Sequence, residues 1–329
     1  MRRVFQVAML VGSLFGGWIG SARADIGFAQ VLAPDAGGPA LQVDLWYPTA
    51  SRASPQRLEL FTQDVAPEAP VDGCCHPLVV FSHGNGGSPG GHYDTALALA
   101  RAGFVVAAVM HTGDNYRDHS EELRLVDRPR HVKAVIDYML MGWAGHAAID
   151  PARIGLFGYS AGGFTALAAI GGKPDYTLIA PYCATHSETF VCALMRTHDV
   201  AAPRPEPASA WLADSRIKAA VIAAPALGFS FTQDGLRGIT IPVQLWAAEN
   251  DRILPVADNA AAVRDALPRP PEYHAVANAD HFDFLAPCPP ALASAVPIIC
   301  AERPGFDRAA FHVTFDADIV AFLTRALAP

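Results

Sequence analysis

Apolar runs of strand length alternate with longer amphipathic stretches along most of this chain. A continuous apolar run indicates a strand buried on both faces, and regular alternation of such strands with helices is typical of parallel strands joined by crossover helices. The sequence therefore predicts an α/β fold, with a mostly parallel central sheet and helices on both faces. The expected strands are residues 40–47, 78–82, 104–110, 153–158, 217–224, 242–247 and 273–277, and the expected helices are 93–101, 129–141, 161–170, 257–267 and 309–327.

Two segments interrupt this alternation. Residues 48–77 form a polar, proline-rich connector without clear periodicity, and residues 174–213 are again rich in proline. A long stretch without periodicity inside a compact domain is often a lid or a binding loop. We therefore expect a single domain over residues 25–329, with a lid-like insertion at about 174–213.

The N-terminal segment has the pattern of a secretory signal peptide. Arg2 and Arg3 precede an apolar run that ends before the small residues Ala22 and Ala24. The run is short for a bilayer span of about 20 residues, which argues against the alternative of an uncleaved anchor. We predict that residues 1–24 are removed and that the mature protein is exported, periplasmic or secreted, without a stable membrane span.

Composition excludes some classes of protein. The chain is 51% hydrophobic and 17% charged, so it is not a disordered chain. It has 24 Lys and Arg against 32 Asp and Glu, and the net charge of −8 gives no support for a nucleic-acid partner.

The six cysteines are expected to be mostly paired, because disulfides form in exported proteins. Cys183 and Cys192 bracket one short loop, and Cys288 and Cys300 bracket another, so each pair is predicted to form a disulfide. The adjacent Cys74 and Cys75 either bridge each other or stay reduced. Zinc binding is the alternative use of cysteine and histidine, but the sequence has no CxxC pair and no HExxH motif, so no metal is predicted.

The strongest local motif is the GYSAGG sequence at residues 158–163, directly after an expected strand and directly before an expected helix. This is the context of the G-x-S-x-G nucleophile elbow, whose tight turn exposes the serine hydroxyl above the sheet. Ser160 is therefore the predicted nucleophile. The dipole of the following helix would point at a developing anion.

A serine nucleophile needs a base and an acid, which follow it in this fold in the order acid and then histidine. Asp251 follows the expected strand 242–247, and His281 follows the expected strand 273–277. Glu249 is the competing acid. His274 lies inside the last strand and is expected to be a packed or surface residue. We predict a Ser160–His281–Asp251 triad.

The oxyanion hole is expected to combine the backbone N–H of Ala161 with one from the glycine-rich loop SHGNGG at residues 82–87. Asn85 is the predicted second donor. A phosphate-binding loop is the rival for such glycines, but no Lys-Ser/Thr follows them. His83 is expected to support the site rather than act as acid or base.

Several residues are candidate substrate contacts. His83 and Tyr159 adjoin the predicted nucleophile in sequence or space, and Phe229 and Phe282, with Trp211 and Phe231, are candidates for lining an acyl pocket. Core packing is the more common place for such aromatic residues. The polar loop at residues 111–119 could bind polar groups of a substrate, or a cation, or be a solvated connector.

The strings SHGNGG, GDNYRDHS, IDPARIGLFGYSAGGFTAL, ENDRILP and ADHFDF together resemble the bacterial "predicted dienelactone hydrolase" group of the α/β-hydrolases. That group is similar to the platelet-activating-factor acetylhydrolases. The resemblance spans about residues 41–327, and it implies the same triad and the same oxyanion donors. Authentic dienelactone hydrolases carry Cys in the elbow, where this chain has Ser160. The resemblance therefore implies a serine carboxylesterase rather than a dienelactone hydrolase.

The expected function is hydrolysis of a small or polymeric carboxylic ester through an acyl-enzyme, without a metal or organic cofactor. Two alternatives remain. The same triad could cleave amides, as a peptidase or polyamide hydrolase, or the chain could be a non-catalytic binding protein on a hydrolase scaffold. The second normally requires the loss of a triad residue, and all three are present.

Overall fold

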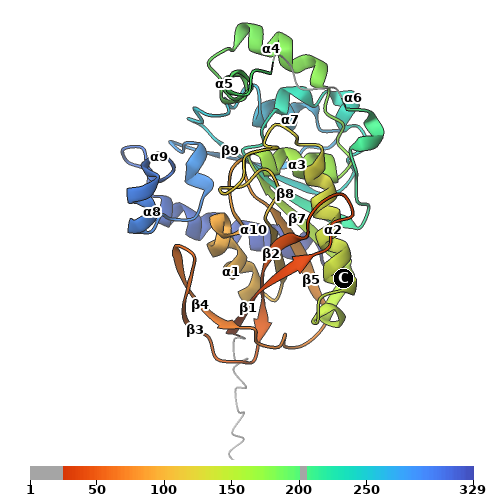
Figure 1. Ribbon diagram of the computed structural model, residues 1–329, viewed down its shortest axis with the longest axis vertical. Helices are drawn as coiled ribbons and strands as arrows, with labels where there is room; N and C mark the ends of the chain where they lie inside the picture. The colour runs from red at the N-terminus through yellow and green to blue at the C-terminus, as the bar shows by residue number, and fades with distance from the viewer. Residues whose placement is uncertain (1–24, 201–205) are drawn as a thin grey trace, which may run out of the picture.

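The computed structural model describes residues 25–200 and 206–329, and the predicted signal peptide lies outside the described residues. In the described part, one ten-stranded sheet has the order β10-β9-β8-β7-β5-β6-β2-β1-β4-β3 (Figure 1). Six neighbouring strands, from β10 to β6, are all parallel, whereas β2 is antiparallel to both β6 and β1. The predicted mostly parallel α/β sheet is confirmed. The strands are β1 (Asp25–Ala33), β2 (Leu41–Thr49), β3 (Ser54–Leu58), β4 (Phe61–Pro67), β5 (His76–Ser82), β6 (Val105–Val109), β7 (Ile149–Tyr159), β8 (Ile217–Ala223), β9 (Val243–Ala248) and β10 (Glu272–Val276).

Alternate side chains of the central strands enter two separate cores. In β5, Leu78 and Val80 belong to the core that helices α2 and α3 cover, whereas Val79 and Phe81 belong to the core under α1 and α10. Both faces of the strand are thus buried, which is why it consists of a continuous apolar run. The helices longer than eight residues are α1 (Tyr93–Arg101), α2 (Asp127–Met141), α3 (Ala161–Ala169) and α10 (Arg308–Ala326).

The remaining helices are shorter. They are α4 (Ile179–Thr185), α5 (Phe190–Thr197), α6 (Gln233–Leu236), α7 (Ala260–Ala266), α8 (Pro290–Ala295) and α9 (Pro297–Cys300), with 3₁₀ turns at Pro89–His92, His146–Ala148, Tyr176–Leu178, Ala208–Ala210, Gly228–Ser230 and His281–Phe284. None of the helices in the described ranges combines the length and hydropathy that a bilayer span requires.

The prediction of an unstructured connector at residues 48–77 is wrong, because this segment contains the antiparallel strands β3 and β4. In β4 the side chains of Phe61, Gln63 and Val65 are buried and those between them are exposed. The alternation of a half-buried strand is therefore present, but a glutamine occupies one inward position. Its Oε1 accepts a hydrogen bond of 2.8 Å from Trp46 Nε1, so the buried amide has a partner.

The segment expected to be lid-like, residues 174–213, contains α4 and α5, which lie at the top of Figure 1 beyond the ends of the strands. A disulfide between Cys183 and Cys192 joins these two helices. A second disulfide joins Cys288 to Cys300, after the 3₁₀ turn at His281. Both are the pairs expected from the sequence. Cys74 and Cys75 are exposed and unbridged.

Candidate active site

Ser160 occupies the sharp turn between β7 and α3. Its backbone has φ 57° and ψ −118°, a conformation that L-residues rarely adopt. A Cβ atom on Gly162 would collide with the carbonyl oxygen of Ser82, and one on Gly158 would collide with the carbonyl oxygen of Gly162. Only glycine allows the turn to pack this closely against the neighbouring strand end.

A buried chain of hydrogen bonds runs from this serine. His281 Nε2 lies 3.0 Å from Ser160 Oγ, and His281 Nδ1 lies 2.7 Å from Asp251 Oδ2. All three residues are buried, whereas the competing acid Glu249 is exposed. Asp251 Oδ1 also accepts from the backbone N–H groups of residues 253 and 254, at 3.0 and 2.7 Å. These contacts orient the carboxylate toward the imidazole.

Hydrogen bonds to its backbone and to Asp283 hold the turn that carries His281 in place. Tyr159 Oη donates a 3.0 Å hydrogen bond to the carbonyl oxygen of His281, and Asp280 Oδ1 accepts from the His281 N–H at 2.8 Å. Arg308, which is fully buried on α10, donates to Asp283 Oδ1 at 3.0 Å. The His281 imidazole therefore has a defined position. Sequence reasoning did not identify Arg308 or Asp283, because their pairing depends on the docking of α10.

The glycine-rich loop after β5 lies beside the serine. Asn85, Ser160 and Ala161 all line one pocket. Within the described part of the chain, the backbone N–H groups of Asn85 and Ala161 have no hydrogen-bond acceptor. Two free donors next to a serine hydroxyl are what an oxyanion hole requires.

A buried ion pair holds this loop in place. Asp114 Oδ1 accepts from Gly86 N at 2.8 Å and from Asn85 Nδ2 at 3.0 Å, and Asp114 Oδ2 pairs with Arg128 Nη1 at 2.5 Å. The same guanidinium donates to the carbonyl oxygen of His83. The polar loop at residues 111–119 thus contributes buried supports for the loop. Arg128 was not identified from sequence, since one arginine near a helix start carries no signal of burial.

Glu122 links the loop to the segment of α4 and α5. Its carboxylate lies 2.6 Å from His198 Nε2, 3.1 Å from His119 Nδ1 and 3.3 Å from Asn85 Nδ2. Burial alone would raise the pKa of Glu122, but these three hydrogen bonds hold it below its usual value. The carboxylate is therefore charged at neutral pH and joins His198, just after α5, to the oxyanion loop.

His83 and Tyr159, two of the candidate substrate contacts, lie behind the pocket. His83 Nδ1 bonds the Gly84 carbonyl oxygen at 2.7 Å, and His83 Nε2 accepts from the His111 N–H at 3.2 Å. Burial, together with the nearby Arg128, lowers the pKa of His83 to about 3, so it stays neutral. Burial also raises the pKa of the Tyr159 phenol well above its usual value. Both side chains have their hydrogen bonds with backbone groups.

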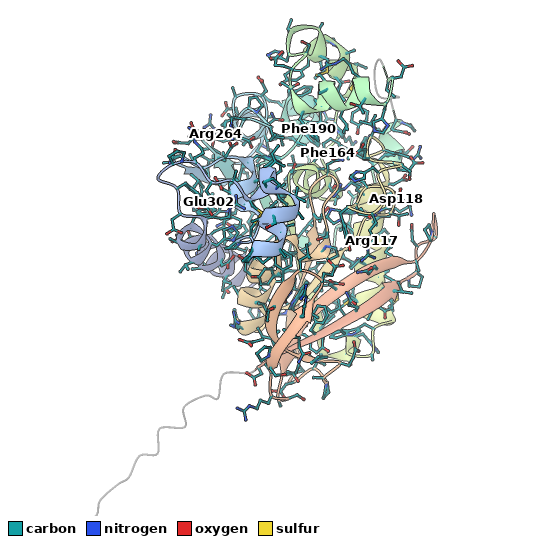
Figure 2. The ribbon with its side chains drawn as sticks, turned by 60° about the vertical axis from the view of Figure 1, so that its left-hand side comes forward. Arg117, Asp118, Phe164, Phe190, Arg264 and Glu302 are labelled. Carbon is teal, nitrogen blue, oxygen red and sulfur yellow. A yellow bond between two sulfur atoms is a disulfide. The ribbon has the colours of Figure 1, made fainter. Side chains whose placement is uncertain are left out.

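The other two candidate substrate contacts are Phe282 and Phe229, and other side chains line the pocket at Ser160. Phe282 packs edge-on against His281, with ring centroids 5.4 Å apart. Phe229 stacks on Tyr182 of α4, with ring centroids 3.9 Å apart. The pocket at Ser160 is instead lined by other apolar side chains, including Leu123, Leu125, Phe190, Val191, Leu194 and Leu254. Three of these come from α5, on which Figure 2 labels Phe190.

The sheet order, the serine at the turn after β7, and the acid and histidine after β9 and β10 define the α/β-hydrolase fold. The structure is similar to that of a ferulic acid esterase from Streptomyces cinnamoneus, with a TM-score of 0.66 and 19% sequence identity over 93% of this chain and 91% of that chain.

Residues 62–133 match the family model of platelet-activating factor acetylhydrolase, isoform II. The resemblance to these acetylhydrolases is confirmed there, over a region that includes the glycine-rich loop at residues 82–87 but not Ser160, Asp251 or His281. No curated protein matches the chain.

Proposed function

We propose that this protein is an exported serine hydrolase that cleaves carboxylic esters through an acyl-enzyme intermediate. The observation that carries the proposal is the buried hydrogen-bonded chain from Ser160 through His281 to Asp251. The names of the similar proteins, an acetylhydrolase and an esterase, agree with it.

In this mechanism Ser160 Oγ attacks the ester carbonyl carbon while His281 Nε2 takes the hydroxyl proton. Asp251 accepts a hydrogen bond from Nδ1–H and stabilises the imidazolium. The N–H groups of Asn85 and Ala161 bind the oxyanion of the tetrahedral intermediate. His281 then gives its proton to the departing alkoxide, which leaves as the alcohol. A water molecule attacks the acyl-Ser160 ester with His281 again as base, and the carboxylic acid is released.

The pocket beside Ser160 supports an apolar acyl group as the bound part of the substrate. Most of its lining side chains are aliphatic or aromatic, and Glu122, at its edge, is engaged by His198, His119 and Asn85. Apolar walls bind an acyl chain through removal of its surface from water. An uncharged acyl group is therefore expected to bind better than a dicarboxylic half-ester, whose free carboxylate would have no cationic partner among these lining residues.

Export is part of the proposal. The signal-peptide pattern in residues 1–24 supports it. The two disulfides, Cys183–Cys192 and Cys288–Cys300, support it independently, because such bonds persist in oxidising compartments.

The test is hydrolysis of nitrophenyl esters of increasing acyl length, with the Ser160→Ala protein as control. We expect turnover by the unmodified protein, loss of turnover by several orders of magnitude in the variant, and an acyl adduct on Ser160 in the intact mass of quenched samples. Equal activity of the two proteins, or an adduct on another residue, would overturn the proposal.

A further inference from the structure

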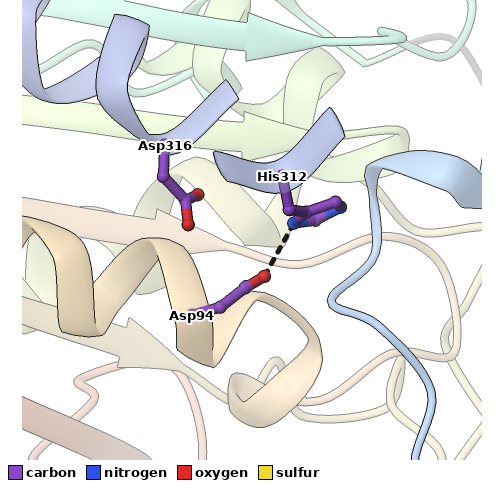
Figure 3. Close-up of side chains that lie close together, drawn as sticks. All are labelled: Asp94, His312 and Asp316. Atoms are coloured by element: carbon purple, nitrogen blue, oxygen red, sulfur yellow. Dashed lines mark ion pairs between the residues drawn. The ribbon is translucent and has the colours of Figure 1, made fainter. Parts of the chain in front are cut away.

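A polar cluster between helices α1 and α10 plays no part in the chemistry described above. Asp94 comes from the first turn of α1, and His312 and Asp316 lie one turn apart on α10, so that the three side chains point toward one another (Figure 3). One ligand atom from each residue lies within 4.8 Å of the other two. The His312 ring is buried, and the two carboxylates are partly buried.

The hydrogen bonds of His312 fix its tautomer. His312 Nε2 lies 3.0 Å from the carbonyl oxygen of Asp283, which can only accept, so Nε2 carries a hydrogen. In the neutral ring Nδ1 then has a lone pair, and this atom lies 2.7 Å from Asp94 Oδ2. The two atoms form an ion pair (Figure 3) but not a hydrogen bond of normal geometry, and neither has another hydrogen-bond partner in the described structure. Two lone pairs facing each other repel, so this contact requires a positive charge, which either a proton on Nδ1 or a bound metal ion would supply.

We propose that Asp94, His312 and Asp316 form a binding site for a divalent transition-metal ion of the Zn²⁺ type. An imidazole nitrogen with two carboxylate oxygens is a donor set that Zn²⁺ accepts, whereas Ca²⁺ and Mg²⁺ prefer oxygen ligands throughout.

The surroundings have the supports that metal ligands usually have. Metal-binding histidines donate their second N–H to a carbonyl or carboxylate oxygen, as His312 does to Asp283, and ligand carboxylates are themselves hydrogen-bonded. Thr95 Oγ1 donates to Asp316 Oδ1 at 2.7 Å. The bound ion would join α1 to α10. Through Asp283 it would also stiffen the turn that carries His281, although the ion would take no part in ester hydrolysis.

The experiment measures zinc content and thermal unfolding of the purified protein after EDTA treatment and after addition of ZnCl₂. The background carries Cys74→Ser and Cys75→Ser, because exposed thiols bind zinc themselves. We expect one bound zinc per chain and a rise in Tm of several degrees. Both effects should disappear in Asp94→Asn and in Asp316→Asn, which keep the side-chain size. They should persist in Asp318→Asn, a matched change on the same helix.

Absence of bound zinc in the protein with intact Asp94, His312 and Asp316 would overturn the proposal, and this measurement does not depend on how well the variants fold. Zinc binding that survives both Asp94→Asn and Asp316→Asn would also overturn it. So would an equal rise in Tm with CaCl₂, since that would indicate an oxygen-only site. If Asp94→Asn lowers Tm without any effect of zinc in the parent protein, the contact is a simple ion pair between Asp94 and a protonated His312.

Discussion

Arg128 offers the sharpest test of how the oxyanion loop is held. This α2 side chain is 2% exposed, and its two terminal nitrogens bond Asp114 Oδ2 and the carbonyl oxygen of His83. Asp114 in turn holds Asn85 and Gly86. Replacing Arg128 with Met keeps much of the length and apolar volume but leaves the Asp114 carboxylate buried without a counter-charge.

The expected losses of stability and of kcat follow from the burial of this ion pair. Removing one partner of a buried ion pair costs about 3–5 kcal/mol, a large share of the roughly 5–15 kcal/mol that stabilises a typical domain. If the loop shifts, the Asn85 donor is lost from the oxyanion hole, which costs about 10²–10³ in kcat. KM should change much less, because the apolar pocket remains. Arg128→Lys keeps the charge but cannot bond both partners. Its free energy of unfolding and its kcat should therefore lie between those of the unmodified protein and those of Arg128→Met.

The matched control is Lys133→Met on the same helix. Lys133 pairs with Asp137 at 2.7 Å, but its side chain is 45% exposed, so its loss should cost no more than about 0.5 kcal/mol. Urea unfolding followed by tryptophan fluorescence gives the free energies of unfolding, and nitrophenyl acetate gives kcat and KM. Such measurements resolve differences of about 1 kcal/mol. If the free energies of unfolding of Arg128→Met and Lys133→Met differ by less than that, or if Arg128→Met keeps full kcat, Arg128 does not hold the loop.

Other predictions address the acid, the pocket and the stability of the fold. Asp251→Asn should lower kcat for nitrophenyl esters by several orders of magnitude while Glu249→Gln stays near normal, and the reverse result would mean that Glu249 orients the base. Phe190→Ala should lower kcat/KM for long acyl chains more than for acetate, since Phe190 lines the pocket; equal effects on all esters would exclude acyl contact. Burial raises the pKa of Asp44 to about 6, so the folded state binds this proton more tightly than the unfolded chain does. The free energy of unfolding therefore falls as the pH rises from about 4 to about 6 and stays level above that. Asp44→Asn should raise the free energy of unfolding by up to about 3 kcal/mol at about pH 8 but hardly at about pH 4, as chemical denaturation at the two pH values would check.

The strands that support the site could be predicted because burial on both faces leaves a clear mark in the sequence. The run at residues 78–82 belongs to β5, and its side chains alternate between two cores. The hairpin of β3 and β4 could not be predicted in the same way. It has one buried face, and Gln63 occupies an inward position because Trp46 provides a hydrogen bond. Only the packed structure supplies that partner.

The acid was harder to predict than the nucleophile. Glu249 and Asp251 are two residues apart after β9, and sequence order allows either. Their environments separate them, since Asp251 is buried against His281 and Glu249 is exposed. The supports Asp114, Arg128 and Arg308 carried no local signal, because charged residues are ordinarily at the surface and their burial depends on partners distant in sequence.

The turn that carries His281 depends on the C-terminal helix α10. Ser160, Asp251 and His281 all precede residue 282, but the turn that carries His281 is held by Arg308 through Asp283 and by the contact of His312 with the Asp283 carbonyl oxygen. During synthesis His281 can reach its final position only after α10 has emerged and docked. Under the proposed export in unfolded form, the proposed hydrolytic activity would therefore arise only after translocation, once α10 has docked.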